Sequence, residues 1–145
     1  MKFSVVPALS LFFSVSSAAA VANQVTLSYD PRYDNAAMSL RDVSCSDGIN
    51  GLIRKGYTTA GSIPNFPHLG GAFAVEGWNS KNCGKCFKVT WRENNKSIFI
   101  TAIDRATGFN IAKRAMDDLT GGMANELGRI NVDYEEAKLS DCKMK

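Results

Sequence analysis

The chain has 145 residues, a formal net charge of +3 and four cysteines. Its 17 basic and 14 acidic residues are interspersed, without the basic cluster or stripe that nucleic-acid binding requires, so nucleic acid is excluded as the expected partner. Beyond the N-terminal segment no apolar run reaches the length of a membrane span, and no repeat or linker divides the chain. We expect one domain with its own core.

The N-terminal segment is typical of a secretory signal peptide. Lys2 precedes an apolar run rich in Val, Leu and Phe, and small residues in an A-x-A pattern follow it. The run is shorter than the roughly 20 apolar residues of a membrane helix. We therefore expect residues 1–20 to be a signal peptide, with cleavage after Ala20 or after Ala22. Residues 21–145 would then form a single secreted, extracellular domain.

The first strand is expected over residues 25–30, where apolar and polar residues alternate until Pro31 stops the pattern. Asp30 ends this strand. The favoured interpretation is that Asp30 opens an ordinary turn. The alternative is that it pairs with a second carboxylate elsewhere in the fold as an acid/base couple.

The four cysteines favour two structural disulfides in an exported chain of this size. Cys83 and Cys86 form a C-x-x-C motif, but it leads into a strand and not into a helix N-terminus, which argues against a redox site. The spacing of the cysteines and of the single histidine, His68, matches no standard zinc site. We favour the pairs Cys45–Cys83 and Cys86–Cys142, although spacing does not separate them from the crossed pairing.

The middle of the chain is rich in turn residues. Residues 46–56 contain a short helix that Gly56 ends, and residues 59–78 form an irregular loop dense in Gly, Pro and Asn. His68 lies in this loop, and a lone loop histidine is more often a surface residue than a catalyst.

The most informative stretch runs from residue 82 to residue 110. Residues 87–91 alternate as a strand, a polar turn follows, and residues 97–103 return as a strand that is apolar on both faces, as in a closed barrel. Asp104 stands where that strand ends, before a Gly-Phe-Asn turn, and is well placed to face a ligand. The alternative is that Asp104 only opens the turn and pairs with Arg105.

The remaining elements complete a small barrel. Asn110 is the expected N-cap of a helix that ends at Gly121-Gly122, and residues 128–134 alternate as a further strand. Asn95 begins an N-glycosylation sequon at the expected hairpin tip. Short strands, few helices and Gly/Pro-rich connections predict a β-barrel with one or two helices outside.

Several segments together resemble the cerato-platanins, small secreted proteins of filamentous fungi. They are VTLSYDPRYD at residue 25, VSCSDG at residue 43, IPNFP at residue 63, GWNS at residue 77, CGKCFKVT at residue 83 and SIFI at residue 97, with Asp104 and GFN at residue 108 after them. The resemblance runs from about Val25 to Cys142 and includes all four cysteines.

The resemblance implies a mainly β fold with short helices, a six-stranded double-psi β-barrel, and the pairs Cys45–Cys83 and Cys86–Cys142. It also implies a secreted, non-catalytic protein that binds oligomers of chitin or N-acetylglucosamine and loosens cell walls. Cellulose is a further expected partner. Related proteins act as elicitors or toxins on plants, so plant surface or immune components are expected partners. Association with the cell wall is a further expectation.

Polar residues at strand ends form the expected sugar site: Tyr29, Asp30, Asp104, Arg105 and Asn110. Carboxylates, an amide and a tyrosine supply the paired donors and acceptors that sugar hydroxyls need. The first alternative is a glycoside hydrolase that uses Asp104 with Asp30, because hydrolysis needs two carboxylates. The second is a surface-active, film-forming protein. Neither a cofactor nor a metal is expected.

Overall fold

A computed structural model describes residues 2–14 and 23–145 of the chain. Residues 2–14 are exposed and contain neither helix nor strand. The expected cleavage positions, Ala20 and Ala22, lie outside the described residues. Among the residues that are described, no helix is long and apolar enough to cross a membrane.

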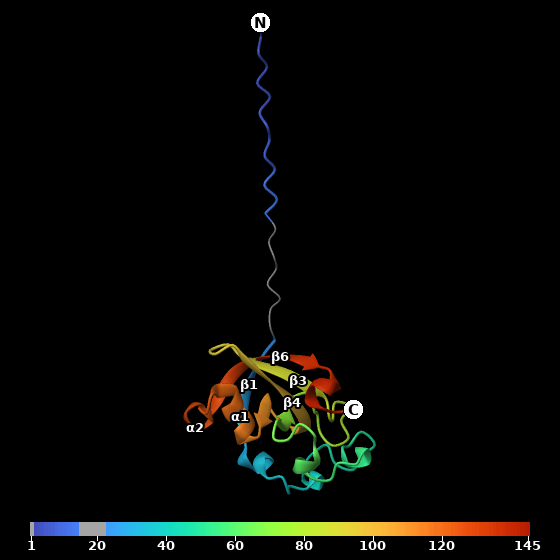
Figure 1. Cartoon of the computed structure of the whole chain (residues 1–145). Coiled ribbons are helices and arrows are strands. Elements are labelled where there is room, and N and C mark those ends of the chain that lie inside the picture. Colours follow the sequence, from blue (N-terminus) through green and yellow to red (C-terminus); the bar gives the residue numbers. More distant parts are fainter. Residues whose placement is uncertain (1, 15–22) are drawn as a thin grey trace.

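Six strands of the described chain close into a barrel in the order β1-β5-β2-β4-β3-β6 (Figure 1). The predicted six-stranded barrel with short helices is therefore confirmed. The strands are β1 (Asn23–Tyr29), β2 (Leu69–Ala72), β3 (Cys86–Trp91), β4 (Lys96–Arg105), β5 (Phe109–Ile111) and β6 (Arg129–Ala137).

Strand β2 gives the barrel its crossed topology. It lies between β4, with which it pairs in parallel, and β5, with which it pairs antiparallel, so the β4–β5 connection must pass over its end. Gly70 makes this possible, because a Cβ there would collide with the backbone of Asn110 and Ile111 on β5. Gly108 in the connection has φ +76°, a conformation that favours glycine, and packs against the Thr26 carbonyl.

The expectation of an irregular loop over residues 59–78 is wrong at this point, because that segment contains β2. Leu69-Gly70-Gly71-Ala72 lacks the β-branched and aromatic residues that mark strands, yet it is fully buried and paired on both sides. Glycines in such a segment predict turns, whereas Gly70 and Gly71 here permit close approach of the neighbouring chain segments.

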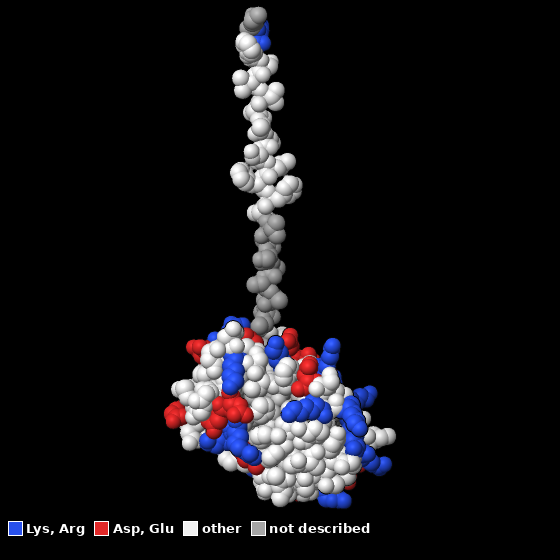
Figure 2. Space-filling model, viewed as in Figure 1, with Lys and Arg blue, Asp and Glu red and all other residues white. Residues whose placement is uncertain are grey.

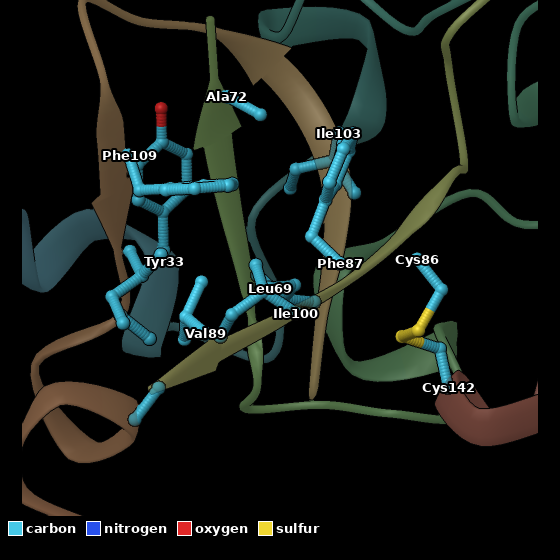
Figure 3. Packing of buried hydrophobic residues seen from close by; sticks show 14 of the residues in the cluster. Tyr33, Leu69, Ala72, Cys86, Phe87, Val89, Ile100, Ile103, Phe109 and Cys142 are labelled. Carbon is cyan, nitrogen blue, oxygen red and sulfur yellow. A yellow bond between two sulfur atoms is a disulfide. The ribbon is translucent and has the colours of Figure 1, made fainter. Parts of the chain in front are cut away.

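Strands β1, β3, β4 and β6 lie where strands were expected, whereas β5 occupies residues for which a Gly-Phe-Asn turn was expected, so that expectation is wrong. The β3–β4 pair is an antiparallel hairpin with Asn95 exposed near its tip, so glycosylation of Asn95 stays a prediction. Barrel strands contribute side chains to one interior cluster, including Phe87, Ile100 and Phe109, and the ring centroids of Phe87 and Phe109 lie 5.6 Å apart (Figure 3).

Helix α1 (Lys113–Thr120) and the short α2 (Ala124–Leu127) lie together on one side of the barrel (Figure 1). Gly121, at φ 69°, ends α1 as predicted. The prediction of Asn110 as N-cap is wrong, since Asn110 belongs to β5 and Ala112 occupies the cap position. The backbone N–H groups of Lys113 and Arg114, which have no partner within the helix, donate instead to the carboxylate of Asp34, at 2.7 and 3.0 Å.

The four cysteines form the predicted pairs Cys45–Cys83 and Cys86–Cys142. The first joins the loop after Ser44 to the loop before β3. The second ties the C-terminal segment to the start of β3, at the edge of the packed interior in Figure 3. Acidic and basic side chains are interspersed over the upper part of the domain in Figure 2, while the lower part of this face is largely uncharged.

Candidate functional site

The carboxylate of Asp104, near the end of β4, is the centre of a hydrogen-bonded cluster of Asp30, Arg32, Tyr33, Ser44 and Asp104, here called the Asp104 cluster. Oδ1 of Asp104 accepts from the backbone N–H groups of Ser44 and Arg105, both at 2.9 Å. Oδ2 accepts from the Tyr33 hydroxyl at 2.8 Å and from Nη2 of Arg32 at 2.6 Å. Four donors therefore occupy the roughly four acceptor sites of a carboxylate.

The turn after β1 supplies two of these donors. Asp30 caps the 3₁₀ helix Pro31–Asp34 by accepting from the Arg32 N–H at 3.0 Å, and Pro31 at its first position has the φ that the helix needs. This short helix places Arg32 and Tyr33 over the end of β4. The predicted turn-opening role of Asp30 is thus part of what builds the site.

Arg32 and Tyr33 also bind each other. Nη2 of Arg32 donates to the Tyr33 hydroxyl at 2.7 Å, and the guanidinium lies 4.7 Å from the centroid of the tyrosine ring. The hydrogen bond to Tyr33 raises the pKa of Arg32 above its ordinary value. Burial raises the pKa of Tyr33 well above its ordinary value, because the phenolate would lose its hydration.

Exposure divides the cluster into a buried and an open part. Tyr33 is only 1% exposed and Asp104 only 7%. The side chains of Arg32 and Asp30 are 48% and 38% exposed, and Arg32 Nε lies 3.5 Å from Oδ2 of Asp30. A ligand that approaches the cluster therefore meets Arg32 and Asp30, and Asp104 holds Arg32 in position from behind.

The other predicted site residues, Asn110, Arg105 and Tyr29, do not belong to the Asp104 cluster as defined above. The register Asn110↔Gly71↔Asp104 places Asn110 in the same row as Asp104, two strands away, and Asn110 accepts from Ser28 Oγ at 3.1 Å. Arg105 contributes its N–H to Asp104 and is exposed. Tyr29 donates to Asn125 of α2 at 3.2 Å, outside the cluster.

Three members of the cluster were not among the predicted site residues: Arg32, Tyr33 and Ser44. Arg32 and Tyr33 follow Asp30 directly, so a polar and aromatic run at a strand end was a usable signal. Ser44 takes part through its backbone N–H, which the residue type does not reveal. Cys45 N–H donates to the Ile103 carbonyl at 3.1 Å and fixes the Ser44 segment against β4.

His68, which we expected at the surface, is partly exposed and lies 2.6 Å from a carboxylate oxygen of Asp118 on α1. It therefore connects the loop before β2 to the helix and takes no part in the Asp104 cluster. Within residues 2–14 and 23–145, His, Cys, Asp and Glu side chains do not gather in threes that could hold a metal ion.

Comparison with known proteins gives consistent matches over the whole domain. The sequence model of the cerato-platanin family matches residues 25–144. The chain is 63% identical over 145 residues to a protein of Arthroderma benhamiae called "Allergen Asp f 15 homolog", covering 100% of this chain and 71% of the relative.

Solved structures agree with the fold. Cerato-platanin 3 from M. perniciosa superposes with a TM-score of 0.81 at 46% identity, covering 84% of this chain and 100% of that one. The solution structure of "the fungal elicitor Cerato-Platanin" superposes with a TM-score of 0.74 at 42% identity, covering 81% and 96%. The sequence resemblance, the crossed six-stranded barrel and both disulfides lead to one conclusion: the chain belongs to the cerato-platanin family.

Proposed function

We propose that this protein is a secreted, non-hydrolytic binder of N-acetylglucosamine oligomers that a host organism detects as an elicitor. The observation that carries the sugar-binding part is the half-exposed Arg32 guanidinium beside the partly exposed Asp30 carboxylate. Together they offer several N–H donors and a carboxylate acceptor within one small area. Sugar hydroxyls and acetamido groups need this combination of donors and acceptors.

The cluster is also rigid before any ligand arrives. Arg32 is held by Asp104 and stacked on Tyr33, whose ring is buried. A long side chain that is already ordered loses less conformational entropy on binding, so the same contacts give a higher affinity. Asp104 supports the sugar site as a positioning residue.

The hydrogen bonds of Asp104 argue against the glycoside hydrolase alternative. Hydrolysis requires one carboxyl group to donate a proton and a second carboxylate to act as base or nucleophile. Asp104 instead accepts four hydrogen bonds and is buried, and Asp30 is occupied as a helix cap and as a partner of Arg32. The buried Asp104 is therefore not arranged to donate a proton to a glycosidic oxygen, and Asp30 alone does not supply both carboxyl groups that hydrolysis needs.

Calorimetric titration with chitotetraose, followed by mass analysis of the recovered sugar, tests this proposal. The expected result is binding with intact tetramer. Arg32→Ala should weaken binding about tenfold, the loss of one to two kcal/mol that removing a charged hydrogen-bond donor causes. Arg41→Ala is the matched control, because Arg41 is an exposed arginine in the next 3₁₀ helix, Leu40–Asp42.

Two outcomes would overturn the proposal. Shortened sugar would mean that the protein is a hydrolase. Equal affinity for the two arginine variants would mean that the Asp104 cluster is not the binding site.

The elicitor part rests on the family, in which one solved structure is named a fungal elicitor. We expect that host detection needs the folded barrel. Leaf infiltration with native protein and with reduced, alkylated protein tests this, with hydrogen peroxide release as the readout. Equal responses would show that a linear peptide is sufficient and that the sugar site plays no part. Wall loosening is tested separately by extension of cellulose paper under constant load, where Arg32→Ala should lower the rate.

A further inference from the structure

Trp78 stands out from the rest of the domain because its indole is 65% exposed and yet fixed in orientation. Nε1 of Trp78 donates to Oδ1 of Asp47 on the neighbouring loop at 2.9 Å. An exposed indole whose polar atom is already bound presents only its apolar faces and edges to a ligand.

The two loops that carry Asp47 and Trp78 are firmly joined. The backbone N–H of Asn50 donates to Oδ1 of Asn79 at 2.9 Å, and Nδ2 of Asn50 donates to the Asn79 carbonyl at 3.0 Å. The disulfide Cys45–Cys83 closes the same pair of loops. The exposed indole is therefore preorganised, so its immobilisation costs a ligand little free energy.

A hollow of about 640 Å³ lies beside the indole, lined by residues 76–82. A second hollow, of about 380 Å³, has Phe73 and Tyr134 in its lining. Asn82 lines both, and its Nδ2 donates to the Ala74 carbonyl at 2.8 Å. The two hollows share Asn82 in their linings, and together they are here called the Trp78 trough.

The second hollow has its own aromatic platform. Phe73 is 38% exposed, and its ring centroid lies 4.9 Å from that of Tyr134. The trough thus has the indole of Trp78 in one hollow, an aromatic pair in the other and the Asn82 amide in the lining of both. Alternation of apolar faces with amides suits a chain of linked sugar rings better than a single small molecule.

The charges in the trough further restrict the occupant. Glu76 and Lys81 line the first hollow, and Lys85 and Glu136 form an ion pair of 3.1 Å in the second. Because opposite charges occur in both hollows, neither a polyanion nor a polycation is favoured. Amide and hydroxyl groups from Asn79, Ser80 and Asn82 make the first hollow too polar for a lipid chain.

From these observations we propose that the Trp78 trough is a second carbohydrate site, which holds a neutral, linear β-1,4-linked glucan or N-acetylglucosamine chain. Such chains carry their ring substituents equatorially, which leaves flat C–H faces for Trp78 and Phe73. The hydroxyl groups at the ring edges reach the amides. Chitin and cellulose share this chemistry, and the experiment below separates them.

The inference extends the proposed sugar binding to a different surface and needs none of the residues of the Asp104 cluster. Variants at the two sites therefore test the two proposals independently. If Asp104→Asn loses affinity and Trp78→Ala does not, the trough proposal fails alone. If Trp78→Ala loses affinity and Asp104→Asn does not, the site proposed around Arg32 fails alone.

The test uses the full mature protein and two insoluble polymers, chitin and microcrystalline cellulose, in a sedimentation binding assay. Trp78→Ala should lower the binding constant for at least one polymer about tenfold, as for an aromatic hot spot. Ile49→Ala is the matched control, since Ile49 is 78% exposed on the partner loop but does not line the trough. It should change binding less than about twofold.

Fluorescence gives a second readout that does not depend on the polymer surface. The chain has two tryptophans, so Trp91→Phe leaves Trp78 as the single indole. Titration of this variant with chitohexaose and with cellohexaose should shift the emission to the blue with one of them or both. An unshifted emission with both sugars would overturn the proposal. So would equal losses for Trp78→Ala and Ile49→Ala, which would indicate non-specific adsorption.

Discussion

The Asp104 cluster and the Trp78 trough place their polar and apolar groups in opposite ways. In the cluster a charged carboxylate is buried and satisfied from within the protein, and only Arg32 and Asp30 reach solvent. In the trough the largest apolar side chain is exposed while its polar atom is bound to Asp47. A buried polar network contributes mainly to stability, whereas a preorganised exposed aromatic contributes mainly to affinity.

Removal of the disulfide Cys45–Cys83 is the strongest test of this comparison, because each of its cysteines directly follows a residue of one of the two regions. Cys45 follows Ser44 of the cluster and Cys83 follows Asn82 of the trough. Replacing both by serine should lower the free energy of unfolding by about 4 kcal/mol in the chain-entropy model. Urea denaturation measures this loss, and sedimentation with chitin measures the loss of affinity expected with it.

The matched control is the Cys86→Ser/Cys142→Ser variant. It should lose similar stability but less sugar affinity at a temperature where it is folded, because that bridge adjoins only the second hollow and does not join the loops that carry Asp47 and Trp78. Equal affinity losses in the two double variants would show that the Cys45–Cys83 bridge does not organise the sites specifically.

Asp104→Ala and Trp78→Ala should differ sharply in stability. Asp104→Ala leaves the Tyr33 hydroxyl and the Ser44 N–H without their acceptor, which should cost about 2–4 kcal/mol. Trp78→Ala removes an exposed side chain and should change the free energy of unfolding by less than about 0.5 kcal/mol. Urea denaturation of the two variants side by side measures both. A comparable loss in Trp78→Ala would mean that the indole is structural.

The buried hydroxyl group of Tyr33 should make the free energy of unfolding depend on pH in the alkaline range. Burial raises the pKa of Tyr33 in the folded protein above the value of about 10 of the unfolded chain, so the folded state retains this proton more strongly. This contribution to stability is fully present below about pH 10 and is lost as the pH rises through the folded pKa. The unfolding free energy of wild type should therefore fall more steeply above pH 10 than that of Tyr33→Phe. Parallel curves would contradict a buried, protonated Tyr33.

Asp47→Ala should give the smallest effect. It removes the acceptor of the Trp78 indole N–H without removing the indole, so Trp78 gains rotational freedom. Loss of this orientation should weaken chitin binding about threefold, because the side chain must then lose conformational entropy when the sugar binds. An unchanged binding constant in the sedimentation assay would show that the Asp47 bond does not preorganise the ring.

The sequence was sufficient for the elements whose pattern is local. Strand β4, with apolar residues on both faces, and the helix end at Gly121 are fixed by residues within the elements themselves. Strand β2 was not predictable in this way. Gly70 and Gly71 are required by the close approach of neighbouring chain segments and not by a pattern within β2 itself. The cap of α1 was missed for the same reason, since Asp34 lies far from Lys113 in the sequence.

The candidate site shows the same limit. Asp104 and Asp30 could be selected because both stand where an expected strand ends, and the structure connects both to Arg32. The contribution of Ser44 comes from a backbone N–H that only the tertiary fold places next to Asp104. The assignment of Asp104 as a groove residue assumed that a polar residue at a strand end faces solvent. Its 7% exposure instead gives it a supporting position.

Amide chemical-shift mapping of the ¹⁵N-labelled mature protein during titration with chitotetraose tests the central claim most directly. The account predicts two separate groups of shifted amides, one around Arg32, Ser44 and Arg105 and one over residues 77–82, with the tetramer recovered intact. Shifts confined to other surfaces, or no shifts at millimolar sugar, would contradict the claim that this barrel recognises carbohydrate through these two regions.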